Sequence, residues 1–233
     1  MSEPLPIVLI PGLLASARMY APQIPHLWRA GPVTIADHTR DDRMSAIAQR
    51  ILATAPERFA LVGLSMGGYI AFEMLRQAPQ RIARVALLDT SARADVPEQS
   101  AMRRAQMTLA SQGRLREVLE QQLPRLVHPA RRNDTALREV FTLMAQEVGA
   151  DAFIRQQTAI MGRSDSRELL GSIRCPALVL VGDADELTPP GRAAEIAAGI
   201  AGARLVTIAG SGHVSTLEQP DAVTRALLEW LQV

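Results

Sequence analysis

Ser65 stands in the stretch G-L-S-M-G-G (63–68), directly after the apolar run R-F-A-L-V (58–62). The pattern G-x-S-x-G is typical of a sharp strand-to-helix turn that exposes the serine hydroxyl at the end of the strand. Side chains at Gly63 and Gly67 would collide with neighbouring backbone in such a turn. We therefore predict that Ser65 is a nucleophile. The alternative, an anion cradle at a helix N-terminus, explains the glycines but leaves the histidine and aspartate loops described below without a role.

A serine hydroxyl needs a general base to become nucleophilic. The chain has four histidines: His26, His38, His128 and His213. His213 ends G-S-G-H immediately after the last apolar run, where glycines allow the loop to reach back over the sheet. His38 follows the second apolar run and is the alternative base. His26 falls within a predicted helix and His128 at a predicted helix end, so both have structural explanations. We expect His213 to be the base.

The base in turn needs an acid that orients its imidazole. The stretch V-G-D-A-D-E-L-T-P-P follows the fifth apolar run and offers Asp183, Asp185 and Glu186. Any one of these carboxylates could hydrogen-bond to the base, and any could instead cap the loop. The spacing of the residues does not choose among them.

An attacking serine also requires two backbone N–H groups that stabilise the oxyanion of the tetrahedral intermediate. Met66 follows the nucleophile at the start of a predicted helix and supplies one of them. The loop after the first apolar run, P-G-L-L (11–14), should supply the other, and we expect it to come from Leu13.

Short apolar runs alternate along the chain with segments of helical periodicity. The runs cover 6–10, 32–36, 58–62, 84–88, 177–181 and 203–209, and the helical segments cover 17–28, 44–55, 66–78, 190–199 and 218–232. Uniformly apolar runs are typical of strands that are covered on both faces. The alternation predicts an α/β fold with a mostly parallel sheet of about six strands and helices on both faces. In such sheets ligands bind at the carboxyl ends of the strands.

Residues 93–173 interrupt this alternation, because they show helical periodicity and no convincing strand. Helices are expected at 97–112, 114–127, 133–148 and 150–162. We predict a helical cap (93–173) inserted after the fourth strand of a core formed by 1–92 and 174–233. Large apolar side chains in the cap could line a pocket for a moderate acyl or alkyl group, although such residues are more often core: Met102, Met107, Phe141, Met144, Phe153 and Met161.

Composition excludes several other functions. The net charge is +1 and the 25 basic residues, all arginines, are scattered, which argues against binding to nucleic acid or an anionic membrane. The single cysteine, Cys175, excludes a multi-cysteine metal site, and no metal or nucleotide motif is present. The start M-S-E-P-L-P is acidic, unlike a secretory signal, and no apolar stretch could span a membrane. We expect a cytoplasmic protein that acts on a small molecule without metal or organic cofactor, in an oligomeric state left open.

With these residues in place, the chain resembles the α/β-hydrolase superfamily over nearly its whole length. Ser65, Asp185 and His213 occur in the family's order of nucleophile, acid and base. In similar enzymes the acid loop reads G-x-x-D-x-x-x-P, which Gly182, Asp185 and Pro189 match, and this favours Asp185. The ending S-G-H-V-S-T-L-E-Q-P is like the family's base segment. The resemblance also makes His38 a residue of the second-strand loop.

The resemblance implies a serine hydrolase that cleaves a small carboxylic ester, lactone or thioester through an acyl-enzyme, with Ser65, His213 and Asp185 as its triad. Where many relatives carry His-Gly in the oxyanion loop, this chain has Pro11-Gly12. Three alternatives fit the same fold: a C–C bond hydrolase, a cofactor-free lyase that uses the same triad, or a non-catalytic small-molecule receptor.

Overall fold

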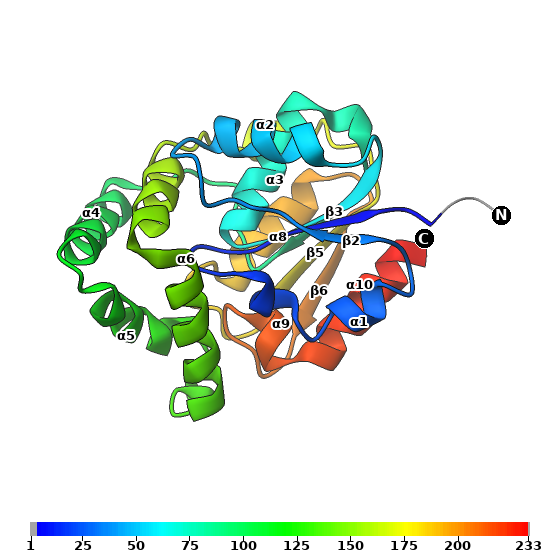
Figure 1. Ribbon diagram of the computed structural model, residues 1–233. Coiled ribbons are helices and arrows are strands. Elements are labelled where there is room, and N and C mark those ends of the chain that lie inside the picture. The colour runs from blue at the N-terminus through cyan, green and yellow to red at the C-terminus, as the bar shows by residue number, and fades with distance from the viewer. Residues whose placement is uncertain (1–3, 233) are drawn as a thin grey trace.

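Six strands form one parallel sheet in the computed structural model, which describes residues 4–232 (Figure 1). The strands lie in the order β2-β1-β3-β4-β5-β6, and every neighbouring pair is parallel. Their bounds are β1 Ile7–Ile10, β2 Val33–Ile35, β3 Phe59–Leu64, β4 Ile82–Leu88, β5 Ala177–Gly182 and β6 Arg204–Ile208. The predicted fold class and strand number are confirmed, because each apolar run became one strand.

Helices cover both faces of the sheet, as its uniformly apolar strands require. One face packs against α2 (Met44–Thr54), α3 (Met66–Gln77) and α8 (Pro190–Gly199). The other face packs against α1 (Ile24–Leu27) and α10 (Pro220–Gln232) (Figure 1). Successive side chains of a strand enter opposite layers, so that in β1 Val8 and Ile10 face one core and Ile7 and Leu9 the other.

The predicted helix at 17–28 is wrong as a continuous element. A short 3-10 helix, η1 (Ala17–Tyr20), is followed by a turn and then by the single turn of α1. Pro22 and Pro25 lack the N–H that the interior of a helix must donate, so they fit only at the beginning of a new turn. For a similar reason the predicted helix at 218–232 begins at Pro220, after a separate short helix, α9 (Ser215–Glu218).

Between β4 and β5 the described chain is helical, as predicted. The long elements are α4 (Pro97–Ser111), α5 (Leu115–Leu126) and α6 (Thr135–Met161), accompanied by the short η3 (Pro129–Arg131) and α7 (Arg167–Leu170). At Gly149, where φ is 78°, α6 bends, so the two helices predicted at 133–148 and 150–162 meet at a kink. Figure 1 shows α4, α5 and α6 on the side toward which the strands run. The division into a core and a cap at 92/93 and 173/174 stays a prediction.

No helix within residues 4–232 is both long enough and apolar enough to cross a membrane. The remaining short element, η2 (Pro79–Arg81), joins α3 to β4.

Candidate active site

Ser65 occupies the tight turn between β3 and α3, with φ 55° and ψ −114°. This backbone conformation is strained for a residue with a side chain, and it lifts the hydroxyl away from the sheet. A Cβ on Gly63 would lie 2.3 Å from the carbonyl oxygen of Gly67, and a Cβ on Gly67 would lie 2.1 Å from that of Ile10. The two glycines therefore let three segments of backbone approach one another around the serine.

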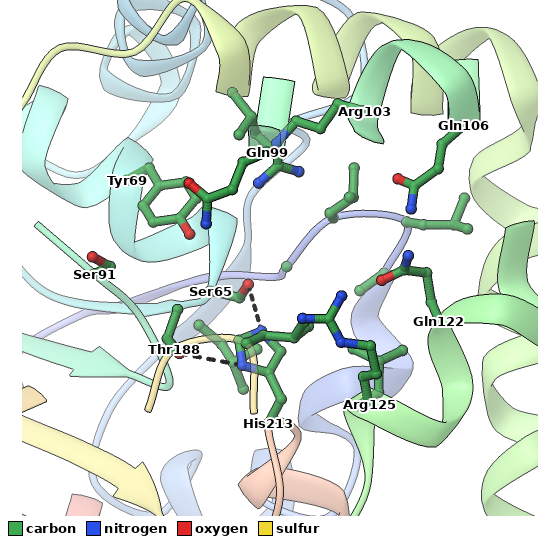
Figure 2. Close-up of a pocket in the computed structure, with 18 of the residues that line it drawn as sticks. Ser65, Tyr69, Ser91, Gln99, Arg103, Gln106, Gln122, Arg125, Thr188 and His213 are labelled. Atoms are coloured by element: carbon green, nitrogen blue, oxygen red, sulfur yellow. Dashed lines mark hydrogen bonds between the residues drawn. The ribbon is translucent and has the colours of Figure 1, made fainter. Parts of the chain in front are cut away.

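The side chains of Ser65, His213 and Asp185 form a continuous chain of hydrogen bonds (Figure 2 labels the first two). Ser65 Oγ lies 2.8 Å from His213 Nε2, and His213 Nδ1 lies 2.8 Å from Asp185 Oδ2. When Nδ1 carries its proton toward the carboxylate, Nε2 is free to accept the proton of the serine hydroxyl. The three residues come from the ends of β3, β5 and β6, which meet at one edge of the sheet.

Asp185 is held in this position by the loop that carries it. The backbone N–H groups of Leu187 and Thr188 donate to Oδ1 at 2.8 and 2.9 Å, and the Thr188 hydroxyl donates to Oδ2 at 2.7 Å. The two alternative acids have other partners. Asp183 accepts the N–H of Ser211, and Glu186 forms an exposed ion pair with Arg132. Only Asp185 of the three contacts the imidazole within the described residues.

Both members of the buried His213–Asp185 pair have shifted pKa values. Burial disfavours the imidazolium, but the charge and hydrogen bond of Asp185 outweigh burial and raise the pKa of His213. Burial likewise opposes ionisation of Asp185, yet the charge and hydrogen bond of His213, with the hydrogen bonds from Thr188, lower the pKa of that carboxyl. The pair therefore favours an ionised carboxylate beside an imidazole that readily takes up a proton.

His38, the alternative base, is buried and does not contact Ser65. Its Nε2 lies 2.9 Å from the carbonyl oxygen of Gly12 in the loop after β1. Burial lowers the pKa of His38, so the neutral ring is favoured. His38 thus supports the loop that carries Leu13. His26 lies in α1, and His128 Nδ1 accepts the N–H of Ala130 in η3.

The amides of Leu13 and Met66 are both available for an oxyanion. Among residues 4–232 neither N–H has a hydrogen-bond partner in the protein, whereas the next amide, that of Leu14, donates to Gln156 Oε1 at 3.0 Å. Leu14 has φ 55°, so the loop after β1 turns sharply at that point. Leu13 and Ser65 line the same cavity, and Met66 begins α3.

A cavity of about 450 Å³ opens above Ser65 and His213, between the sheet and helices α4 to α6. Of the six large apolar residues noted between β4 and β5, four line it: Met102, Phe141, Met144 and Phe153. Met107 and Met161 do not line it. Its walls also carry polar groups from the same helices, including Gln99, Gln106, Gln122 and Arg125 (Figure 2). The cavity is of a size that suits a small organic molecule.

Two buried carboxyls that the sequence analysis did not assign to the site brace its loops. Asp89, directly after β4, accepts the N–H of Gly182 at 3.0 Å and the hydroxyl of Ser215 at 2.6 Å. Glu218 accepts the N–H groups of Gly212 and His128, each at 2.7 Å. The sequence does indicate a place near the site for Asp89, because this residue directly follows the predicted strand at 84–88 and so lies at the carboxyl edge of the sheet. Glu218 lies within the base segment that resembles the family's.

Among residues 4–232 no group of three or more histidine, cysteine, aspartate or glutamate side chains is placed to hold a metal ion.

Comparison with known proteins places this chain among hydrolases. The model of the alpha/beta hydrolase family matches residues 6–226. The chain is 25% identical to pimeloyl-(acyl-carrier protein) methyl ester esterase of Edwardsiella ictaluri (strain 93-146), over 95% of this chain and 86% of that protein. A thermophilic esterase from Thermogutta terrifontis, solved with malate bound, superimposes with a TM-score of 0.89 at 29% identity, covering 100% of this chain and 91% of that one. The enol-lactonase from Burkholderia xenovorans LB400 gives 0.87 at 25% identity, covering 100% and 93%.

Proposed function

The chain belongs to the alpha/beta hydrolase family and is an enzyme, and from this premise we propose that it hydrolyses a small carboxylic ester, lactone or thioester with Ser65 as nucleophile. The observation that carries the proposal is the hydrogen-bond chain Ser65–His213–Asp185, which ends in an apolar-walled cavity. The three relatives named above are two esterases and an enol-lactonase by name, which supports a carboxylic ester or lactone as the substrate class.

In the first half of the proposed reaction, Ser65 Oγ attacks the carbonyl carbon of the substrate and its proton passes to His213 Nε2. The carbon–oxygen (or carbon–sulfur) bond to the leaving group then breaks, and His213 returns the proton to the departing alcohol or thiol. Asp185 keeps Nδ1 protonated and stabilises the transient imidazolium. The product of this half is an ester between the acyl group and Ser65.

In the second half a water molecule takes the place of the alcohol. It gives a proton to His213 and attacks the acyl carbon, after which the bond to Ser65 Oγ breaks and the serine recovers the proton. In both halves the N–H groups of Leu13 and Met66 stabilise the negative oxygen. A pair of such donors in a water-poor pocket is usually a large contributor to the rate enhancement.

The test is hydrolysis of p-nitrophenyl esters of increasing acyl chain length by wild type and by Ser65→Ala. If the triad acts as a unit, the substitution lowers kcat by about 10⁶-fold. Ser91→Ala is the matched control, because Ser91 lines the same cavity but its hydroxyl contacts no histidine. A serine-directed fluorophosphonate should label Ser65 alone, as peptide mass spectrometry can show. Equal turnover by wild type and Ser65→Ala would refute the proposal.

A further inference from the structure

Arginine is the main charged residue in the wall of the cavity. Five arginines line it: Arg93, Arg103, Arg125, Arg163 and Arg192. Glu98, which is exposed at the beginning of α4, is the acidic residue of the same lining. A cavity wall that carries more guanidinium groups than carboxylates attracts an anion.

Three of these arginines already have carboxylate partners. Arg93 forms a bidentate pair with Glu195, and Arg103 and Arg163 share the buried carboxylate of Asp95 at 2.6 Å each. The guanidinium of Arg192, in α8, forms no ion pair or hydrogen bond among residues 4–232, and its charge lowers the pKa of Glu195 only after those of Arg93 and Arg167.

Arg125, like Arg192, has no carboxylate partner in the described part of the chain, but it lies beside the residue that contacts the base. Within residues 4–232 the one polar contact of its guanidinium is Met102 Sδ, 3.9 Å away, and it forms no ion pair. The side chain is half-buried, so it is only partly hydrated. A partly desolvated charge without a counter-ion is costly, and a bound anion would remove that cost.

Arg125 is also next to the reacting groups. The backbone N–H of His213 donates to the carbonyl oxygen of Leu126 at 2.9 Å, so the residue beside Arg125 is hydrogen-bonded to the base itself. Figure 2 shows Arg125 and Gln122 extending from α5 toward the Ser65–His213 pair. A molecule whose carbonyl is attacked by Ser65 therefore occupies the cavity that Arg125 also lines.

We propose that Arg125 is a substrate-binding residue that holds a carboxylate of the substrate, so that the enzyme prefers half-esters of dicarboxylic acids to neutral esters. The inference depends on the proposed function and adds the substrate's charge to it. A guanidinium presents two parallel N–H groups that match the two oxygens of a carboxylate. Gln122 lies three positions before Arg125 in α5 and lines the same cavity, so its amide can also donate to a carboxylate.

The test compares two substrate series that are matched in length: monomethyl esters of dicarboxylic acids, and methyl esters of unbranched monocarboxylic acids. Wild type is expected to show a higher kcat/KM for the anionic series, with the best chain length revealing the reach of Arg125. Arg125→Gln should lower kcat/KM for the anionic esters roughly 10- to 100-fold more than for the neutral ones, mostly through KM. Arg116→Gln is the control, because Arg116 is exposed on the same helix and outside the cavity.

Two further measurements guard against a misfolded variant or a different anion. Arg125→Lys keeps the charge but loses the paired N–H groups and should fall between wild type and Arg125→Gln. Esters that carry a terminal phosphate in place of the carboxylate form a third series. Dependence on Arg125 that is confined to the phosphate series would overturn the carboxylate assignment.

Equal or better hydrolysis of neutral esters by wild type, or an equal loss in both series on Arg125→Gln, would also overturn the inference. If neutral esters are cleaved through Ser65 while Arg125 has no selective effect, only this inference fails. If Ser65→Ala retains wild-type turnover, the proposed function fails with it.

Discussion

Gln156 should control catalysis from outside the cavity, through the loop that carries Leu13. Its Oε1 accepts the N–H of Leu14, a residue with φ 55° and therefore in the left-handed region. Such a conformation costs a side-chain-bearing residue on the order of 1–3 kcal/mol and persists only where its surroundings impose it. The hydrogen bond from α6 holds this turn at Leu14 itself, beside the contact of His38 with the Gly12 carbonyl.

Gln156→Leu removes the acceptor while keeping a buried side chain of similar size. An unsatisfied buried N–H costs about 1–3 kcal/mol, but the Leu14 N–H is only partly buried and Gln156 Nε2, which the substitution also removes, is a buried donor without a partner. We therefore expect the free energy of unfolding to fall by about 1 kcal/mol or less. If Leu14 then leaves the left-handed region, the Leu13 amide turns away from the oxyanion. Loss of one such donor lowers kcat by about 10²- to 10³-fold and should leave KM nearly unchanged.

The assay is kcat and KM for a p-nitrophenyl ester, together with urea unfolding of the same samples. Gln157→Leu is the matched control, because Gln157 is equally buried and adjacent but bonds Arg103 and Gln106 instead of the loop. It should lose at least as much stability, because both of its amide atoms are hydrogen-bonded, while kcat stays within about tenfold of wild type. Equal kcat values for the two variants would show that Gln156 does not position the oxyanion loop.

Two more predictions concern stability and the turn at Ser65. Burial and the Asp185 carboxylate raise the pKa of Asp89 from 3.8 to about 7, so between these pH values the folded state binds more protons than the unfolded state, and wild-type stability falls as pH rises. Asp89→Asn removes this dependence on pH. In urea unfolding, the stability of the variant relative to wild type should therefore rise by up to about 4 kcal/mol between about pH 4 and about pH 7. Plots of stability against pH that run parallel for the two proteins would contradict this. Gly67→Val should abolish folding or ester hydrolysis, because even a Cβ would lie 2.1 Å from the Ile10 oxygen, whereas Met66→Leu should cost less than about 1.5 kcal/mol. Wild-type activity and melting temperature in Gly67→Val would refute the steric argument.

The site residues that could be predicted from the sequence are those marked by their immediate neighbours in the chain. Ser65 is marked by glycines on both sides and by a preceding apolar run, and His213 and Asp185 follow apolar runs in the same way. Because the strands are parallel, the ends of these runs had to meet at one edge, and the structure brings the three side chains into contact there. The choice of Asp185 over its neighbours needed the family resemblance.

The residues that sequence reasoning missed act over long separations. Gln156 lies 142 positions from Leu14, and nothing around it distinguishes it from Gln157. Arg125 is one of many scattered arginines, and only the packing of α5 against the His213 loop singles it out. The prediction of one helix at 17–28 was wrong for a different reason. The apolar periodicity continues across Pro22 and Pro25, but these prolines exclude a continuous helix.

The hydrogen bond between His213 N–H and the Leu126 carbonyl couples the end of α5 to the position of the base. Glu218 adds to this coupling, because it bonds Gly212 on one side and His128 on the other. A displacement of α5 would therefore also withdraw the imidazole from Ser65. By linkage, any ligand contact that stabilises α5 in place also stabilises the aligned base, and to the same extent in free energy. If Arg125 binds substrate as proposed, contacts that hold the substrate would also help to hold the base in line with Ser65.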